Sequence, residues 1–174
     1  MPSDRSTGLT DVNALDRASF VALLGGVFEH SPWVAEAAWS RRPFASLDAL
    51  HRAMADAVEN AGAAAQLGLL RVHPELARPG PLTAASRGEQ GGLGLQAVTG
   101  DEAARFGQAN ELYRERFGFP FIIAVRGERD RAAILRAMTE RLSNAPDAER
   151  RRALTEVTRI ARFRLLDLLG GDDG

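Results

Sequence analysis

The chain lacks two residue types that carry much of covalent enzyme chemistry. None of its 174 residues is Cys, and all 22 basic residues are Arg, so the sequence has no Lys. A Cys nucleophile, a thiolate metal ligand and a Lys Schiff base are therefore excluded. A small scaffold held together by disulfides is excluded for the same reason.

An excess of charge of one sign and long apolar runs are also missing. The formal net charge is −1, with arginines and acids interleaved, which gives no field for nucleic acid or an anionic membrane. No apolar run approaches the ~18 residues that a membrane span needs, and the polar N-terminus has no basic-then-apolar signal pattern. We therefore expect a cytoplasmic protein without a nucleic-acid or membrane partner.

The length and the hydrophobic content of 45% are typical of one globular domain. We expect a flexible tail over residues 1–12, a single helical domain over 13–170 and a short tail over 171–174. Apolar residues recur at three- and four-residue steps, which predicts an all-α, single-domain helical bundle of about seven to nine helices. The one β-like run, 119–125, has no second strand to pair with, so we interpret it as a buried extended segment.

Local signals predict where several helices begin and end. Asn13, with Asp16 three residues later, is expected to cap the first helix, and Ser46 to cap a later one. Thr99-Gly-Asp-Glu102 has the pattern of a capping box, opening a long helix that ends at Phe117 before Gly118. Further helices are expected over residues 33–39, 47–60, 63–70, 83–95, 129–142 and 146–169.

The three histidines do not form a metal site by their spacing. No pair of His30, His51 and His73 stands three or four residues apart, and no Cys could complete a site, so we expect no metal. His51 is expected to face solvent, and His30 to tie one helix end to the next. His73 stands at a helix end directly before a proline, where a rigid backbone can hold an imidazole in a cleft. From the residues alone, a catalytic and a structural role of His73 are equally open.

Three polar residues lie close together on one predicted helix. Ser86, Glu89 and Gln90 group a hydroxyl, a carboxylate and an amide near one helix face. A single Ser-x-x-Glu pattern is more typical of a helix cap than of a site. The glycines of 88–94 lack the spacing of a nucleotide-binding loop, and the sequence around a nucleophilic serine is missing.

Several motifs, taken together and in chain order, resemble one family. They are Phe28-Glu-His-Ser-Pro-Trp-Val-Ala35, His73-Pro-Glu-Leu-Ala77, Ser86-Arg-Gly-Glu-Gln90, Asn110 with Tyr113, Arg116-Phe-Gly-Phe-Pro-Phe-Ile-Ile123, and Arg164. This combination spans nearly the whole chain and resembles the 2-oxo-4-hydroxy-4-carboxy-5-ureidoimidazoline (OHCU) decarboxylases. The all-helical fold of that family agrees with the helices predicted from periodicity.

The resemblance implies a set of site residues. His73 and Glu89 match catalytic positions. The positions that it implies for substrate binding are Pro74, Ser86, Gln90, Phe121, Ile122, Ile123, Ala124, Val125, Arg126 and Arg164. One departure is the stiff stretch Arg78-Pro-Gly-Pro81 after the His73 motif, which we expect to alter the rim of the pocket.

The resemblance also implies a reaction: decarboxylation of OHCU to (S)-allantoin in urate degradation. The substrate ring accepts the electrons left by carbon dioxide, so no cofactor is expected. We expect a homodimer that acts on a small molecule. Two alternatives stay open: a non-catalytic helical interaction module whose partner surface is Trp33, Trp39 and Phe44, and a cofactor-free lyase or hydrolase acting on a related ureide. The enzyme hypothesis requires His73, Glu89 and Arg164 to converge on one cleft.

Overall fold

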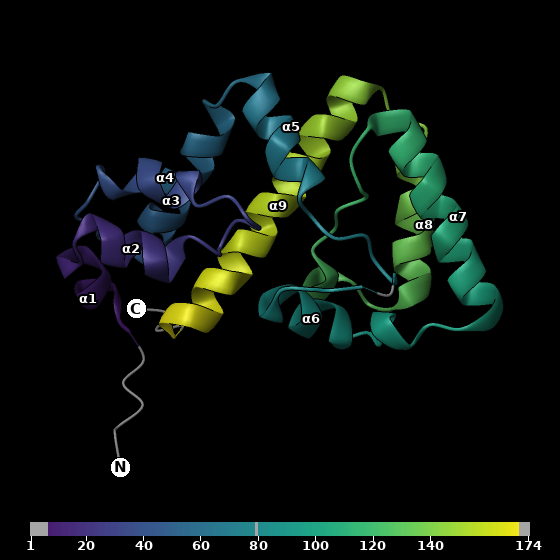
Figure 1. Ribbon diagram of the computed structural model, residues 1–174, viewed down its shortest axis with the longest axis horizontal. Helices are drawn as coiled ribbons and strands as arrows, with labels where there is room; N and C mark the ends of the chain where they lie inside the picture. The colour runs from purple at the N-terminus through teal and green to yellow at the C-terminus, as the bar shows by residue number, and fades with distance from the viewer. Residues whose placement is uncertain (1–6, 79, 171–174) are drawn as a thin grey trace, which may run out of the picture. The chain divides into compact units, whose positions relative to one another are not determined.

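The computed structural model describes residues 7–78 and 80–170, which form nine α-helices, two short 3₁₀ turns and no β-strand (Figure 1). The all-helical prediction and its range of seven to nine helices are confirmed. The elements are α1 (Leu9–Ala14), α2 (Arg17–Leu24), α3 (Trp33–Trp39), α4 (Leu47–Glu59), α5 (Ala63–Arg71), α6 (Ala84–Gly91), η1 (Leu95–Ala97), α7 (Gly100–Phe117), η2 (Val125–Gly127), α8 (Arg131–Arg141) and α9 (Pro146–Leu169).

The chain divides into two compact units. Unit 1 comprises Met1–Leu69 and Thr158–Gly174, and unit 2 comprises Leu70–Val157, so α9 contributes its first half to unit 2 and its second half to unit 1. The single domain expected over 13–170 stays a prediction. The predicted tail 171–174 and residues 1–6 of the N-terminal tail lie outside the described residues. Residues 9–12, also placed in that tail, are helical, because α1 begins at Leu9 and buries Val12.

Unit 1 is organised around α3, which packs against both α2 and α4. The predicted cap at Ser46 is confirmed, because its hydroxyl accepts a hydrogen bond from the amide of Ala49 (3.1 Å). The predicted cap at Asn13 is wrong. Asn13 lies within α1, its side-chain amide pairs with the backbone N–H and C=O of Phe44 (2.8 and 2.9 Å), and Asp16 caps α2 instead. The Asn13 side chain thus forms hydrogen bonds with both backbone polar groups of Phe44, which is 31 residues later in the sequence. Local sequence does not reveal this contact.

Two of the three residues expected to form the surface of an interaction module make packing contacts within unit 1. Phe44 is buried and stacks on Phe20, with ring centroids 6.3 Å apart. The guanidinium of Arg42 lies 4.4 Å from the Trp39 ring centroid and covers that ring. Trp39 and Phe44 are therefore already packed against residues of their own unit.

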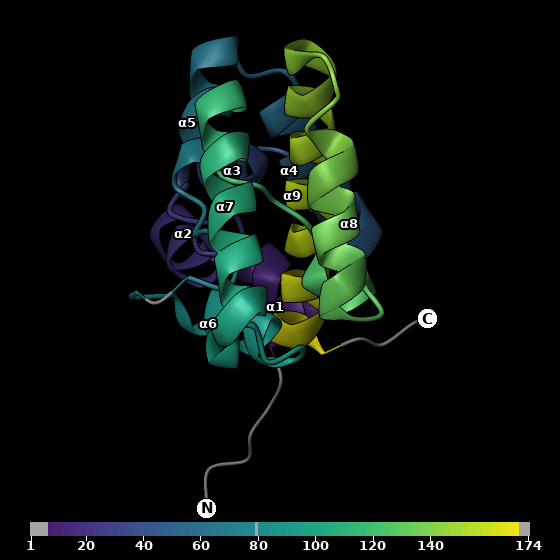
Figure 2. The same cartoon turned by 90° about the vertical axis from the view of Figure 1, so that its right-hand side faces the viewer.

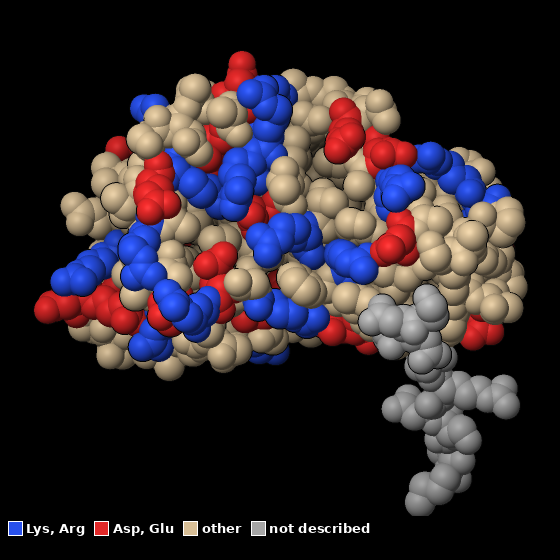
Figure 3. All heavy atoms as spheres, turned by 180° about the vertical axis from the view of Figure 1, so that it is seen from behind, with Lys and Arg blue, Asp and Glu red and all other residues tan. Residues whose placement is uncertain are grey.

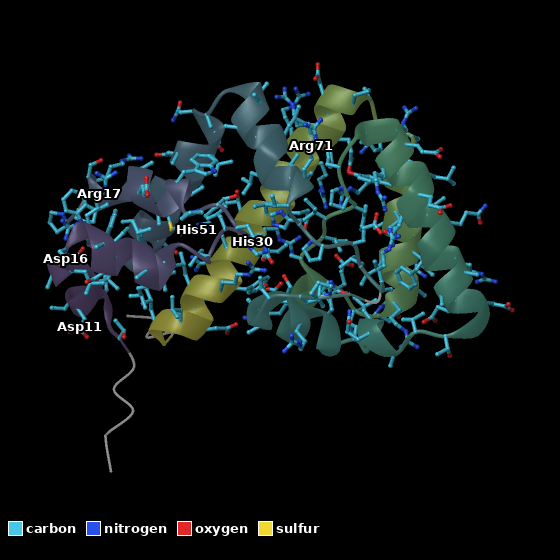
Figure 4. The ribbon with its side chains drawn as sticks, in the orientation of Figure 1. Asp11, Asp16, Arg17, His30, His51 and Arg71 are labelled. Carbon is cyan, nitrogen blue, oxygen red and sulfur yellow. The ribbon has the colours of Figure 1, made fainter. Side chains whose placement is uncertain are left out.

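The two histidines of unit 1 lie in different surroundings (Figure 4). Nε2 of His51, on α4, lies 2.8 Å from the carbonyl oxygen of Thr158, so the expectation that His51 faces solvent is wrong. His30 lies in the turn between α2 and α3 with φ of 46°, and its side chain is exposed. Among the described residues, no group of three or more His, Asp or Glu could hold a metal ion.

Unit 2 contains two long helices, α7 and α8, that lie side by side (Figure 2). The predicted end of α7 is confirmed: Gly118 follows Phe117 in the left-handed conformation (φ 76°) and donates to the carbonyl of Arg114. The capping box expected at its start is wrong in detail, because Thr99 precedes α7 without a side-chain hydrogen bond. Residues 119–125 are then buried, as predicted; the non-helical stretch ends at Ala124, and Val125 begins η2.

A buried polar cluster holds the core of unit 2 together. Glu149, in the first turn of α9, is fully buried and accepts hydrogen bonds from the Tyr113 hydroxyl (2.5 Å) and from Arg141 Nε (2.7 Å) on one oxygen. Asn144 donates to its other oxygen at 2.8 Å. Arg141 also donates to the carbonyl of Ile122 (2.8 Å). The cluster therefore joins α7, α8, α9 and the extended segment.

The distribution of charges and the lack of long apolar helices in the described residues agree with what the composition predicts. Arginines and acids are interspersed on the face shown in Figure 3. Neither α7 nor α9, the helices of 18 and 24 residues, has an apolar stretch able to cross a membrane.

The first prediction concerns Tyr113, the only tyrosine of the chain. Burial, and next the hydrogen bond to Glu149, raise the pKa of Tyr113 above its usual value. Above pH 10 the unfolded chain releases this proton while the folded chain keeps it, so stability falls as pH rises, by up to about 1.4 kcal/mol per pH unit. Because the chain has no Lys and no Cys, no other side chain titrates between pH 9 and 11.

Urea unfolding at pH 8, 9, 10 and 11 measures this slope, and tyrosinate absorbance should appear together with unfolding. Tyr113→Phe is the control: it should be less stable at pH 8 and lose the slope above pH 10. Tyrosinate absorbance that rises near pH 10 in the folded protein would contradict the burial argument.

Candidate active site

His73 occupies a fixed position just beyond the end of α5. The helix ends at Arg71, and Pro74 has no N–H and cannot continue it. The backbone N–H of His73 donates to the carbonyl of Leu70 (3.4 Å), and the residue is buried, with 8% of its surface exposed. The helix end expected just before His73 is confirmed.

The turn after His73 is held by two buried amide side chains. Ala77 has a left-handed backbone (φ 56°), which is costly for a residue with a Cβ. Its N–H donates to Oε1 of Gln90 (3.2 Å), and Asn110 Nδ2 donates to the carbonyl of Leu76 (2.9 Å). Gln96 also donates to Oε1 of Gln90 (2.9 Å). Gln90 and Asn110 thus stabilise the conformation of the loop that carries His73.

Helix α6 places the predicted polar residues beside this loop. It begins after Thr83, whose hydroxyl accepts from the amide of Ser86 (3.2 Å). Ser86 and Gln90 are buried and Glu89 is half-buried. Because α6 packs against η2, its residues lie near Val125 and Arg126. Arg126 itself is exposed.

The segment Phe121–Val125 is buried along its whole length, and its backbone is already partly paired. The carbonyl of Ile122 accepts from Arg141, and the N–H of Ala124 donates to Glu156 Oε2 (2.9 Å). The ring of Phe121 packs edge-on against Tyr113 (5.3 Å) and lies 4.3 Å from the Arg141 guanidinium. The amide of Ala124 is therefore committed to Glu156 and is not a spare donor for an anion.

Arg164 lies in unit 1, on the second half of α9. Its guanidinium forms a buried ion pair with Glu29 (2.7 Å) and approaches the carbonyls of Gly26 and Val27 (3.3 and 3.5 Å). Since His73 and Glu89 belong to unit 2, the convergence of all three on one cleft stays a prediction. Glu29 was not singled out from the sequence, although it stands inside the motif 28–35.

A cavity of about 470 Å³ in unit 2 opens beside the His73 loop. His73 and Pro74 line it, together with Arg71, Arg78 and Arg114. The predicted residues of α6 and of the segment 121–125 are not among the described residues that line it. Glu75, the one acidic residue among the described residues of the wall, forms ion pairs with Arg78 and Arg114.

Of these charged wall residues, sequence reasoning placed only Arg78 near a pocket, within the stiff stretch 78–81, and it assigned no role to Arg71, Glu75 or Arg114. Arg71 stands two positions before His73 and Glu75 two positions after it. This closeness in sequence was the only local sign that they could lie near His73. Arg114 comes from α7 and reaches the cavity only through the fold.

Comparisons with a family model and with known proteins point to the same family. Residues 13–166 match the family model described as OHCU decarboxylase. The chain is 47% identical over 159 residues to 2-oxo-4-hydroxy-4-carboxy-5-ureidoimidazoline decarboxylase of Haloferax volcanii, covering 91% of this chain and 94% of that protein. It is 43% identical over 169 residues to the protein of the same name from Mus musculus, with 93% of each chain covered.

Two solved structures are similar as well. A crystal structure of (S)-allantoin synthase superposes with a TM-score of 0.77 at 30% identity; the match covers 97% of this chain and 56% of that one, so this chain spans little more than half its length. A crystal structure of OHCU decarboxylase in the presence of (S)-allantoin has a TM-score of 0.67, covering 90% of this chain and all of that one; at 23% identity this likeness shows the fold alone. Because the family model covers most of the chain and close relatives match nearly end to end, this chain belongs to the OHCU decarboxylase family.

Proposed function

We propose that this chain is a carboxy-lyase that converts OHCU to (S)-allantoin in urate degradation without a cofactor. Family membership supports this activity, and so do the names of the similar proteins. The structural observation that carries the proposal is the hydrogen bond between Ala77 N and Gln90 Oε1, because it joins the loop of His73 to the helix of Ser86 and Glu89. An imidazole and a carboxylate predicted to be catalytic thus belong to two directly bonded elements.

The systematic name of OHCU defines the chemistry. One ring carbon bears the carboxylate and a hydroxyl, and the next bears the ureido group and a ring imine. When the bond to the carboxylate breaks, its electron pair moves into the ring and the imine nitrogen takes up a proton. The hydroxyl then becomes a carbonyl by losing its proton, and the carbon that bears the ureido group gains one. One proton is consumed overall, and one carbon dioxide is released.

His73 and Glu89 have complementary tasks in this proposal. His73 delivers the proton to one face of the ring carbon, which makes the product the S enantiomer. Glu89 binds the hydroxyl or the ureido group, and its negative charge near the carboxylate favours loss of carbon dioxide. Ser86 and Gln90 orient the substrate on the same face of α6.

The other predicted residues keep supporting roles as proposals. Phe121, Ile122, Ile123 and Val125 form an apolar wall, and Pro74 borders it. Arg126 and Arg164 are proposed to bind the substrate's anionic or carbonyl oxygens. Ala124 is proposed to contribute through its position beside Val125, since its amide already donates to Glu156.

Exchange of His73 tests the proton donor. His73→Ala should lower turnover by about 10²- to 10⁴-fold, the usual contribution of one positioned acid or base. The product should also lose its S excess, because spontaneous decay of OHCU gives racemic allantoin. Circular dichroism of freshly generated OHCU follows both rate and stereochemistry. His51→Ala, the same change at a histidine that lies outside the site, is the control.

Stereospecific (S)-allantoin formation by His73→Ala at the wild-type rate would overturn the assignment of His73. Wild-type protein that leaves OHCU decay unchanged, but acts on another ureide, would favour the alternative of a related lyase or hydrolase.

Exchange of Glu89 tests the carboxylate. Glu89→Gln keeps the shape of the side chain and removes its charge, so decarboxylation should slow by about tenfold or more while the melting temperature changes little. Glu111→Gln, on the exposed surface of α7, is the matched control. An unchanged rate for Glu89→Gln would remove Glu89 from the mechanism.

We also propose the homodimer and the cytoplasmic location implied by the sequence. Light scattering of the purified chain measures its oligomeric state, and fractionation of the source cell measures its compartment.

A further inference from the structure

The cavity beside the His73 loop has a charge composition that the proposed reaction does not use. Its described wall carries three guanidinium groups, those of Arg71, Arg78 and Arg114, and a single carboxylate, that of Glu75. Glu75 pairs with Arg78 and Arg114, so its one negative charge is shared between two cations. The wall is therefore positive before any charge on His73 is considered.

Arg71 is the arginine of this wall that no described carboxylate pairs with. Its Nε donates to the carbonyl of Gly118 at 3.2 Å. Figure 4 labels Arg71 at the end of α5. The bond to Gly118, the residue that ends α7, anchors the plane of the guanidinium at the cavity. Its two terminal nitrogens then form an edge that suits two oxygens of one anion.

The three arginines reach the cavity from separate elements. Arg71 belongs to the last turn of α5, Arg78 to the loop after His73, and Arg114 to α7. Side chains from three directions around a concave wall can surround a small ligand, whereas arginines along one exposed helix face cannot. A volume of about 470 Å³ accepts a small organic acid or an inorganic oxyanion.

We propose that this cavity is a binding site for a small carboxylate or oxyanion, with Arg71 as its principal ligand. Arg78 and Arg114 contribute their remaining donors, while Glu75 holds both in place and limits the site to one small anion. The site is separate from the α6 residues assigned to the reaction, because Ser86, Glu89 and Gln90 do not line it. It shares His73 and Pro74 with the reaction site, so an anion bound here lies next to the loop that carries His73.

Binding is best measured by isothermal titration calorimetry on the full chain at low ionic strength. The probes are inorganic phosphate, allantoate as a ureido carboxylate, and allantoin as a neutral relative of similar size. Phosphate and allantoate should bind with one site per chain, and allantoin should bind at least about tenfold more weakly in this cavity. Arg71→Gln should weaken both anions by at least about tenfold, the usual range for a charge-assisted hydrogen bond.

Two variants separate binding from a merely structural role of Arg71. Arg116→Gln is the matched control, because Arg116 is exposed on α7, donates to a backbone carbonyl (Asn144, 3.0 Å) and does not line the cavity. It should leave anion binding unchanged. Arg71→Lys keeps the charge but not the two-nitrogen edge, so phosphate affinity should fall, but less than in Arg71→Gln. If the only role of Arg71 is to hold α5 against Gly118, Arg71→Gln will lower the melting temperature without changing the affinity for either anion. That result would overturn the proposal.

The source of the anion follows from kinetics on the same variants. If the substrate's own carboxylate uses the site, Arg71→Gln should raise KM about tenfold with little change in kcat. If a free anion uses it, added phosphate should change the turnover of wild-type enzyme and not that of Arg71→Gln. Absence of phosphate and allantoate binding to the wild-type chain would refute the site. Because calorimetry does not depend on turnover, that result stays distinguishable from a failure of the proposed reaction.

Discussion

The buried ionic contact between Glu149 and Arg141 is the interaction on which unit 2 depends. Neither charge can be removed alone without leaving the other desolvated, which typically costs about 3–5 kcal/mol. The same two side chains reach Tyr113 on α7 and the backbone of Ile122. Three helices and the extended segment are thus joined at one carboxylate. The first turn of α9 also favours a negative charge at Glu149, because the N–H groups of a helix point towards its N-terminus.

The candidate site is built on this support. Hydrogen bonds to Arg141 and Glu156 fix the backbone of the segment 121–125. Because η2 follows directly from this segment, α6 packs against a fixed surface. Gln90 of α6 in turn accepts from Ala77, and Asn110 of α7 donates to Leu76, so the turn after His73 keeps a left-handed backbone that it would otherwise avoid. Strain of this kind persists only where the surroundings determine it. Buried amide side chains therefore hold the turn that follows His73, while exposed arginines line the cavity beside it.

Much of the helical structure could be predicted because its signals are local. Ser46, Thr83 and Gly118 act within one turn of their own helix, and α9 has the bounds expected from its proline start and glycine end. The failures share one cause. The side chains of Asn13 and His51 form hydrogen bonds with residues 31 and 107 positions away in the sequence. Their roles therefore depend on tertiary contacts. Thr99 matches a capping box in sequence and makes no side-chain bond in the structure. For the site, His73 was found through its helix end and proline, whereas Arg114 and Asn110 were not assigned, since nothing near them in sequence points to the loop of His73.

The sequence by itself determined the all-helical class, the exclusion of Lys and Cys chemistry, and the family, because composition, periodicity and ordered motifs are properties of the chain alone. The tertiary structure decided which groups are already engaged. It commits the amide of Ala124 to Glu156, the carbonyl of Gln90 to Ala77 and the guanidinium of Arg164 to Glu29, and it leaves Arg71 without an acidic partner among the described residues. The physical reason is that hydrogen bonds and ion pairs act over about 3–4 Å, and only folding brings residues far apart in sequence within that distance.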